Sequence, residues 1–407
     1  MTATGAGAAI GAIIKPSSGW LVEPFTMGTP GEFARVRETL VRIGYTERAL
    51  CERAKVQSIY DLAVLPIADT PIGKPSDALS AVAHLFLEGA RIPWTVVRSL
   101  LDKSAIDAFQ ALGVLVSLTT DPDVCIAPLA IYPVAGLYIA SDRYGSVFDV
   151  AQRLPTDLVY AALTPEARDF VRLMPRVQCD DYLELCSGTG IAALIAARSF
   201  AKRAWGIDIT ERSTRFARFN AALNDLDNAT MLEGDLYTPV AGRTFDLIAA
   251  HPPYVPSLDD DMVFRDGGDD GERVTRGILA GVADHLRPGG RFFCACMLTD
   301  RKGLPLESRI RSMLGPHESD FDLVVGQRMQ YDIEAHFANA AQSGQITKET
   351  LARMLRRFQE LGVERFIGTG FLVRRRPEHA TRASVTRRRV TTPKTIGAYL
   401  EWSLEWA

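Results

Sequence analysis

The sequence has no uninterrupted apolar segment of the length that a bilayer-spanning helix needs, which argues against a membrane protein. The first twenty residues hold a short apolar run with no charged region before it, and this is not typical of a signal peptide. We therefore expect a flexible tail over residues 1–29 and a cytoplasmic protein. The sequence also has no large excess of either charge, because 46 Lys and Arg are balanced by 49 Asp and Glu. The net charge of −3 indicates no polyanionic partner.

The patterns of cysteine and histidine that mark metal sites are missing as well. The six cysteines form no C-x-x-C pair, and none of the six histidines clusters near them. Cys294 and Cys296 alternate along an apolar segment, so they share one face of a predicted strand. We expect buried thiols in a reducing cell and no metal site.

The first half of the chain predicts a small, mostly helical domain over residues 30–150. A helical region at 30–62 precedes three short helices near 78–88, 93–101 and 104–112, and strand-like runs joined by TTDPD follow. Three helices and a hairpin are typical of a winged-helix domain, which can read DNA. The third helix holds Asp107 and Gln110 beside Lys103, so we expect a docking or substrate-presenting module instead.

Strands and helices alternate between residues 165 and 378. This pattern predicts an α/β fold, a doubly wound, Rossmann-like sheet of seven strands with helices on both faces. A helical insertion at 331–361 is long for a connection, and long enough to cover a substrate site. Residues 379–407 predict a basic tail, usually a solvated feature, although its arginines keep phosphates open as a partner. The end of this tail predicts a short helix that docks through Trp402 and Trp406.

A cofactor site is predicted where the first strand of this domain runs into glycines, in DYLELCSGTG at 181–190. Gly188 and Gly190 let the backbone approach a ligand closely, and the helix that follows offers free N–H groups. Dinucleotide sites share this turn, and Ala193 completes G-x-G-x-x-A. Glu184 favours another ligand, because its carboxylate would oppose a pyrophosphate yet tolerate a cationic sulfonium.

Two further acids follow the next strands. Asp208 lies 20 residues after Gly188, a spacing at which a carboxylate can bind ribose hydroxyls. Asp235 comes after the third strand and could accept a hydrogen bond from an adenine amino group. Plainer interpretations are a helix cap for Asp208, with Thr210 as a rival cap, and a turn residue for Asp235. Since all three acids fall at carboxyl ends of strands, where open α/β sheets bind ligands, we favour one shared site.

The fourth strand ends in His251-Pro-Pro-Tyr254, and here the sequence resembles a known family. The order ELCSGTG, GID, GDLY and x-P-P-Y is similar to that of class I S-adenosylmethionine-dependent methyltransferases. Within them it looks like the HemK-like protein-glutamine methyltransferases, which act on release factors or ribosomal proteins. The DGGDDG loop at 266–271 and the helical front domain add to the likeness. The resemblance implies S-adenosylmethionine as the cofactor, with cofactor-binding residues Glu184, Cys186, Gly188, Gly190, Asp208, Ile209, Asp235 and Leu236 and catalytic residues His251, Pro252, Pro253 and Tyr254.

The turn also has a physical logic for methylating a planar nitrogen, whose delocalised lone pair makes it a poor nucleophile. Carbonyl groups of His251 and Pro252 could accept its N–H hydrogens, and Tyr254 could stack on the acceptor group. Catalysis would then come mainly from positioning. The family has Asn, Asp or Ser where this chain has His251, which could donate, accept or take up a proton near neutral pH, or turn away and leave only its backbone in use.

The DGGDDG loop has two interpretations: Asp270 caps the helix that begins near Glu272, or the loop forms a rim of the acceptor pocket. We favour the cap. Three functions stay open. The first is a nitrogen methyltransferase whose partner is a macromolecule, either a release factor or ribosomal protein, or RNA or DNA. The second is a methyltransferase of small molecules, and the third a non-catalytic scaffold that binds the cofactor. A homodimer also stays open.

Overall fold

The computed structural model describes residues 24–62, 74–143, 155–258, 262–332, 337, 347–392 and 394–405. The chain divides into two compact units, one formed by Met1–Tyr138, Asp142–Pro155 and Gln342–Gln345, the other by Ile139–Ser141, Thr156–Ala341 and Ile346–Ala407. Most of the tail predicted at 1–29, part of the insertion predicted at 331–361, and Trp406 lie outside the described residues. None of the helices in the described ranges is both long and apolar enough to cross a membrane.

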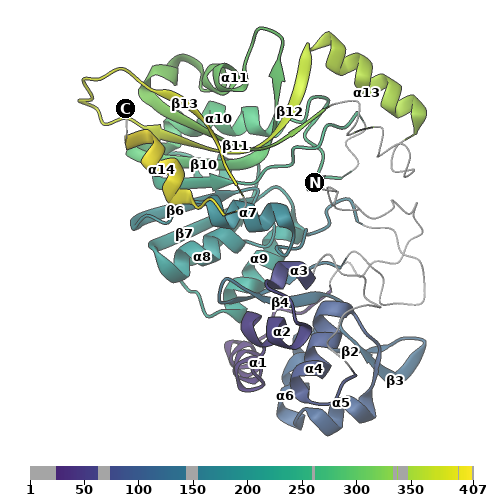
Figure 1. Cartoon of the computed structure of the whole chain (residues 1–407). Coiled ribbons are helices and arrows are strands. Elements are labelled where there is room, and N and C mark those ends of the chain that lie inside the picture. Colours follow the sequence, from purple (N-terminus) through teal and green to yellow (C-terminus); the bar gives the residue numbers. More distant parts are fainter. Residues whose placement is uncertain are drawn as a thin grey trace. The chain divides into compact units, whose positions relative to one another are not determined.

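The first unit is mostly helical (Figure 1). It contains α1 (Pro30–Arg42), α2 (Glu47–Ala54), α3 (Ile59–Leu62), α4 (Ala78–Ala83), the π-helical turn η2 (His84–Glu88), α5 (Trp94–Leu100) and α6 (Lys103–Ala111). The strands β1 (Ile92–Pro93), β2 (Val116–Leu118) and β3 (Asp121–Ile126) form an antiparallel sheet in the order β1-β3-β2. β4 (Ala130–Val134) pairs with β5 (Leu137–Ser141). The order of α4, α5, α6 and the β2–β3 hairpin follows the predicted arrangement.

Local signals in the sequence start these helices. Thr29 and Glu32 form a capping box at α1, where Pro30 occupies the first turn, and Asp77 and Asp102 cap α4 and α6. The buried guanidinium of Arg143 donates hydrogen bonds to five carbonyl groups, those of Leu85, Phe86, Leu87, Ala127 and Leu129. A long-range contact of this kind satisfies backbone groups around the π-helical turn that the turn itself cannot pair.

The second unit is built on one sheet of eight strands: β6 (Cys179–Leu185), β7 (Ala201–Asp208), β8 (Ala229–Glu233), β9 (Phe245–Ala250), β10 (Leu286–Arg301), β11 (Phe321–Tyr331), β12 (Val363–Arg375) and β13 (Thr386–Val390). Their order is β13-β11-β12-β10-β9-β6-β7-β8. β12 runs antiparallel to both neighbours, and the other pairs are parallel. The predicted doubly wound α/β fold is confirmed.

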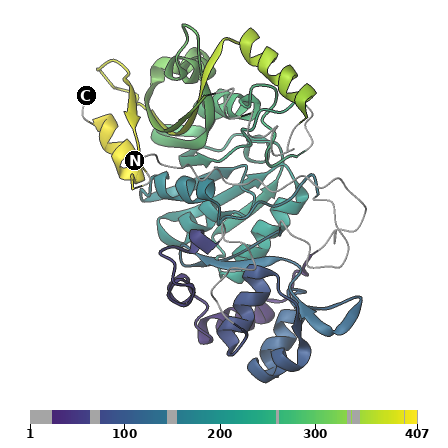
Figure 2. The ribbon, with the colours of Figure 1, turned by 45° about the vertical axis from the view of Figure 1, so that its right-hand side comes forward.

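Helices cover both faces of this sheet (Figures 1 and 2). They are α7 (Pro165–Leu173), α8 (Ile191–Ser199), α9 (Glu211–Leu223), α10 (Arg273–His285), α11 (Leu306–Met313), α13 (Lys348–Glu360) and α14 (Gly397–Glu405). Side chains of α10 and α11 share one core with the strands, including Ile278, Val282, Ile310, Phe292 and Cys294. α7 packs on β10 and α14, and the ring of its Phe170 stacks on Phe293. The long alternating segment of the sequence thus folds around a core on each side of the sheet.

The segment predicted as a basic tail is part of the sheet, and this corrects the prediction of seven strands. β13 pairs in parallel with β11, and α14 buries Leu400 and Leu404. The arginines that indicated a solvated tail have acidic partners far away in the sequence: Arg388 contacts Asp300 and Glu307, and Arg382 contacts the buried Asp322. These neutralising contacts let a strand rich in arginine join the edge of a sheet.

Candidate active site

Four neighbouring parallel strands end at one edge of the sheet. Leu185 of β6 lies opposite both Ile207 of β7 and Ala250 of β9, and Asp208 lies opposite Glu233 of β8. Ligands of open α/β sheets bind at the carboxyl ends of the strands. The structure therefore brings the segments that follow these strands to a common edge: Cys186–Gly190, Asp208 and Ile209, Asp235 and Leu236, and His251–Tyr254.

The turn between β6 and α8 uses positive φ angles at alternate residues: 55° at Cys186, 51° at Gly188 and 77° at Gly190. A Cβ on Gly190 would lie 3.1 Å from the Cβ of Ala217, whereas a Cβ on Gly188 would meet no heavy atom within 4 Å. Gly190 therefore serves close packing of the chain. Gly188 borders open space, where a ligand can approach the backbone.

Glu184 is directed toward the start of helix α8. The side chain is buried, and its oxygens accept the N–H groups of Ala193 at 2.8 Å and Ala192 at 3.3 Å. Burial raises the pKa of Glu184 to about 8, although these two N–H groups lower it. In this arrangement Glu184 fastens the first turn of α8 to β6. Direct contact of Glu184 with a ligand stays a prediction.

Asp208 links the glycine turn to the end of β7. One carboxylate oxygen accepts the N–H of Gly188 at 2.8 Å, and the other accepts the N–H and the hydroxyl of Thr210, both at 3.1 Å. Burial raises the pKa of Asp208, and these hydrogen bonds oppose the rise. The cap of α9 is Thr210, whose hydroxyl accepts the N–H of Ser213, so the alternative in which Asp208 caps that helix is wrong.

The other residues predicted to bind the cofactor follow β7 and β8 at the same sheet edge. Asp235 is exposed, Ile209 is 56% exposed, and Leu236 has a φ angle of 46°. Burial raises the pKa of the Cys186 thiol, and the negative charges of Asp208, Glu184 and Asp235 raise it further. The exposed Asp235, the exposed Ile209 and the open space over Gly188 suit a cationic ligand with hydroxyl and amino groups.

The turn after β9 is braced by the DGGDDG loop. Val255 and Asp266 form a parallel bridge, Gly267 donates its N–H to the carbonyl of Val255 at 2.9 Å, and Ser257 donates to Gly268. A Cβ on Gly271 would lie 2.4 Å from the carbonyl oxygen of Tyr254, so only glycine allows this approach. The loop therefore fixes the backbone of the Pro-Pro-Tyr turn from behind.

Asp270 has several partners but does not cap α10, so the predicted cap is wrong: the N-cap residue is Glu272, and no side chain caps the helix. The carboxylate of Asp270 accepts the N–H of Glu272 at 3.0 Å, just before α10 begins at Arg273. It also accepts two hydrogen bonds from Arg276 and one from Arg301. These partners outweigh burial and lower the pKa of Asp270 to about 2. Asp270 is thus a permanently charged anchor of the loop.

His251 is held between aromatic rings. Its imidazole stacks on Phe170 of α7, with ring centroids 5.3 Å apart and planes 22° apart, and lies 5.8 Å from the ring of Tyr254. Burial lowers the pKa of His251 to about 4. The imidazole is therefore neutral at pH 7, and uptake of a proton near neutral pH, which the sequence left open, does not occur in this setting.

Tyr254 lies between the main core of the second unit and a separate aromatic cluster. Phe337, Phe358 of α13 and Phe366 of β12 form that cluster, with centroids 5.2 to 5.7 Å apart, and Tyr254 packs against it. Burial raises the pKa of Tyr254 well above its ordinary value, so the phenol stays protonated. Helix α13, from the predicted insertion, thus contributes to the wall beside Tyr254.

Several residues beside the turn were not predicted from the sequence. The negative charge of Glu166 on α7 raises the pKa of Tyr254, and Tyr160 and Tyr331 also lie close enough to do so. Thr164 and Pro165 are a readable start signal for α7, and Thr164 does cap it. Nothing in that signal says that Phe170 stacks on His251, since 81 positions separate the two residues in the sequence.

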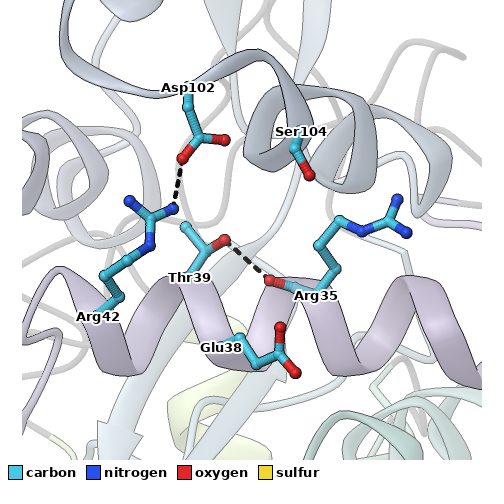
Figure 3. Close-up of a pocket in the computed structure, with 6 residues that line it drawn as sticks. All are labelled: Arg35, Glu38, Thr39, Arg42, Asp102 and Ser104. Carbon is cyan, nitrogen blue, oxygen red and sulfur yellow. Dashed lines mark hydrogen bonds and ion pairs between the residues drawn. The ribbon is translucent and has the colours of Figure 1, made fainter.

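A recess in the first unit contains none of the predicted site residues. It has a volume of about 360 Å³ and is lined by Arg35, Glu38, Thr39, Arg42, Asp102 and Ser104 (Figure 3). Arg42 and Asp102 form an ion pair across it at 2.6 Å. Its basic and acidic side chains neutralise each other, so it offers no selective charge. Within the described part of the chain, no group of His, Cys, Asp and Glu is arranged to hold a metal ion.

The matched family and relatives agree with this geometry. Residues 166–319 match the family described as Methyltransferase small domain. A putative protein N5-glutamine methyltransferase of Methanocaldococcus jannaschii is 33% identical over 120 residues, which are 28% of this chain and 60% of that protein. A ribosomal protein uL3 glutamine methyltransferase of Bradyrhizobium diazoefficiens is 34% identical over 125 residues, 28% of this chain and 39% of that protein.

A third relative, a release factor glutamine methyltransferase of Caulobacter vibrioides, is 35% identical over 118 residues, which are 26% of this chain and 40% of that protein. The similarity to each of these proteins thus spans less than two thirds of the relative's own length. The family match at residues 166–319 includes the glycine turn and the Pro-Pro-Tyr turn.

Proposed function

We propose that this chain, whose residues 166–319 match the family described as Methyltransferase small domain, transfers a methyl group from S-adenosylmethionine to a planar nitrogen of a macromolecule. The acceptor that we favour is the side-chain amide of a glutamine in a protein of the translation apparatus, and the place of action is the cytoplasm. One observation carries the proposal: the His251–Tyr254 turn leaves β9 at the same sheet edge as the glycine turn and Asp208. The three relatives, all named as glutamine methyltransferases, support it.

The cofactor would be held by residues of this edge. The backbone at Gly188 offers close approach, and Asp208 and Asp235 offer carboxylate oxygens to hydroxyl and amino groups. Ile209 and Leu236 offer apolar contact to a planar ring, and Cys186 lies among the acids. Glu184 would act by holding α8 and the turn in place. When bound, the cofactor supplies an electrophilic methyl group on a sulfonium.

The acceptor would be held by the turn after β9. Carbonyl oxygens of His251 and Pro252 would accept the two N–H hydrogens of an amide and so orient its lone pair. The ring of Tyr254 would lie against the planar amide, and the DGGDDG loop keeps that backbone rigid. A neutral His251, packed on Phe170, adds no positive charge near a cationic methyl donor. The proton of the methylated amide would then leave to water, so no strong base is needed.

The test is transfer of labelled methyl groups from S-adenosylmethionine to purified release factor, total ribosomal proteins, ribosomal RNA and a small-molecule extract. We expect the labelled methyl groups in one protein fraction. Proteases should release this label, and nucleases should not. Tyr254→Ala should lower the transfer rate on the order of 100-fold, because a misplaced acceptor loses near-attack geometry. Affinity for S-adenosylhomocysteine should stay unchanged in that variant, whereas Asp208→Ala should lose it.

Tyr254→Phe is the matched control, since it keeps the ring and removes only the hydroxyl. If Tyr254→Ala transfers methyl groups as fast as the wild type, the turn is not the acceptor site. Label in RNA or DNA would show that the acceptor is a nucleic acid and not a protein. Label only in small molecules would show that the acceptor is a small molecule. Binding of S-adenosylhomocysteine without turnover on any fraction would identify a non-catalytic scaffold.

A further inference from the structure

The His251–Tyr254 turn leaves the sheet at the point where β9 stops pairing with β10. The last pair between these two strands is Ala250 opposite Cys294, and β10 continues beyond it. On its other side β10 still pairs with β12, where Thr299 lies opposite Phe366. The side of β10 that β9 covers earlier therefore needs other partners for its buried backbone groups.

The side chain of Glu272 provides such a partner. One of its carboxylate oxygens accepts the N–H of Thr299 at 2.9 Å and the hydroxyl of Thr299 at 2.7 Å. Arg309 of α11 donates to both carboxylate oxygens of Glu272, and also to the carbonyl and the hydroxyl of Thr299, both at 2.7 Å. Glu272 and Arg309 are buried. The carboxylate thus takes the place beside β10 that β9 no longer fills.

Glu272 is bonded directly to the glycine that touches the Pro-Pro-Tyr turn. A Cβ on that residue, Gly271, would lie 2.4 Å from the carbonyl oxygen of Tyr254, and a Cβ on Gly267 would lie 2.9 Å from that of Pro253. The loop is therefore in close contact with two consecutive carbonyl groups of the turn. Any shift of Glu272 along β10 would move these glycines, and the turn would have to move with them.

We propose that Glu272 is a positioning residue for methyl transfer. Its contacts with Thr299 and Arg309 hold the DGGDDG loop, and the loop holds the turn that orients the acceptor amide. The proposal rests on the proposed function and adds a buried residue that acts on the acceptor only through the loop. A purely structural role would lower stability and leave the rate of each folded molecule unchanged. A positioning role lowers that rate, because transfer depends on near-attack geometry.

Glu272→Gln tests the proposal, since it keeps the shape of the side chain and removes its charge. We expect kcat to fall on the order of tenfold with the acceptor fraction that the labelling assay identifies. Rates are divided by the number of sites that bind S-adenosylhomocysteine. The affinity of these sites should change less than about twofold, because the glycine turn and Asp208 follow other strands.

Two further variants separate position from stability. Adding Arg309→Gln to Glu272→Gln removes the unpaired buried cation, so the double variant should regain thermal stability without regaining kcat. Thr299→Val removes the hydroxyl that contacts both side chains and should lower kcat in the same direction. Thr299→Ser keeps that hydroxyl, and its kcat should stay within about twofold of the wild type. The Thr299 pair also decides the matter if Glu272→Gln does not fold.

Asp322→Asn is the matched control. Asp322 is another buried carboxylate that pairs with arginines, Arg374 and Arg382. It lies opposite Arg374 on β12, at the other end of that strand from Phe366. This variant should melt at a lower temperature and keep its kcat per binding site. Equal kcat in Glu272→Gln and the wild type would overturn the proposal, as would a kcat that returns together with stability in the double variant.

Hydrogen exchange provides a measurement that needs no turnover. The N–H groups of Val255 and Gly267 form the hydrogen bonds that join the turn to the loop. Their exchange should become faster in Glu272→Gln and stay unchanged in Asp322→Asn. If the wild type methylates no acceptor but this local change is found, only the proposed function is wrong. If exchange at both groups stays as slow as in the wild type, Glu272 does not position the turn.

Discussion

Burial keeps two ionisable side chains of the candidate site in their neutral form. It removes a positive charge in one case and a negative charge in the other. His251 would be a cation if protonated, and its pKa is lowered to about 4. Glu184 would be an anion if ionised, and its pKa is raised to about 8. Desolvation is the first cause in both. Both side chains therefore carry little charge of their own near pH 7.

The depressed pKa of His251 predicts a loss of stability in mild acid. The unfolded chain takes up a proton near pH 6.5, whereas folded His251 resists it down to about pH 4. The neutral imidazole therefore contributes up to about 3 kcal/mol to the free energy of unfolding. This contribution is fully present above pH 6.5 and is lost as the pH falls from 6.5 to 4. In the variant His251→Asn, the free energy of unfolding should decline less between pH 6.5 and 4 than in the wild type, because the contribution of His251 is missing. Urea denaturation at several pH values measures this decline.

The variant Glu184→Gln is the comparison for that measurement, because a raised carboxyl pKa makes stability fall with rising pH, whereas the lowered pKa of His251 makes it rise. Folded Glu184 binds a proton up to about pH 8, and the unfolded chain releases it near pH 4.5, so its contribution falls as the pH rises between these values. Removing it should flatten the decline in stability between pH 4.5 and 8, and below pH 6.5 this change is opposite in sign to the change expected for His251→Asn. An identical acid-side profile in His251→Asn and the wild type would contradict the neutral, buried imidazole.

At the scale of elements, β13 is held at the edge of the sheet by side-chain contacts from β11, β12 and α11. Asp322 of β11 is 1% exposed and accepts hydrogen bonds from Arg374, from Arg382 and from the N–H of Val385. Arg311 of α11 donates to the carbonyl of Val385 at 2.7 Å. These bonds hold the connection into β13, so the C-terminal segment stabilises β11 and is not an appendage.

Arg382→Gln should therefore destabilise the protein, because it leaves the buried Asp322 with fewer partners. We expect a loss of about 1 to 3 kcal/mol in the free energy of unfolding, measured by urea denaturation. Arg387→Gln on β13 removes the same charge without a described acidic partner, and it should cost less than about 0.5 kcal/mol. Combining Arg382→Gln with Asp322→Asn should restore part of the stability. Equal stability of Arg382→Gln and Arg387→Gln would show that the contact to Asp322 contributes nothing.

At the scale of the whole molecule, the border between the two units does not fall between β5 and the next helix. Ile139–Ser141, at the end of β5, belongs to the second unit. There Asn220, which is fully buried, accepts the N–H of Ala140 at 2.7 Å and donates to the carbonyl of Ala140 at 3.0 Å and of Thr189 at 3.0 Å. Because Thr189 is in the glycine turn, this short segment supports the candidate cofactor site.

A fragment that begins at Ile139 should therefore bind S-adenosylhomocysteine with the affinity of the full chain, as measured by calorimetry. We expect it to methylate the macromolecular acceptor more slowly, on the order of tenfold or more, if the first unit is the docking module that its winged-helix order predicts. A fragment that begins at Thr156 is the control and should melt at a lower temperature, since it leaves Asn220 buried without Ala140. Full transfer activity in the Ile139 fragment would contradict a docking role for the first unit.

The sequence by itself determined the fold of the second unit and the edge of the sheet at which to look. Alternating segments fix which residues form strands, and parallel strands bring their carboxyl ends together, so the glycine turn, Asp208 and His251 could be assigned to one edge in advance. Only the tertiary structure decided that Glu184 is directed toward α8, that Phe170 packs on His251, and that an arginine-rich segment forms β13. Spacing along the chain fixes backbone direction, whereas burial, protonation and ion pairing depend on what packs over a side chain from elsewhere in the sequence.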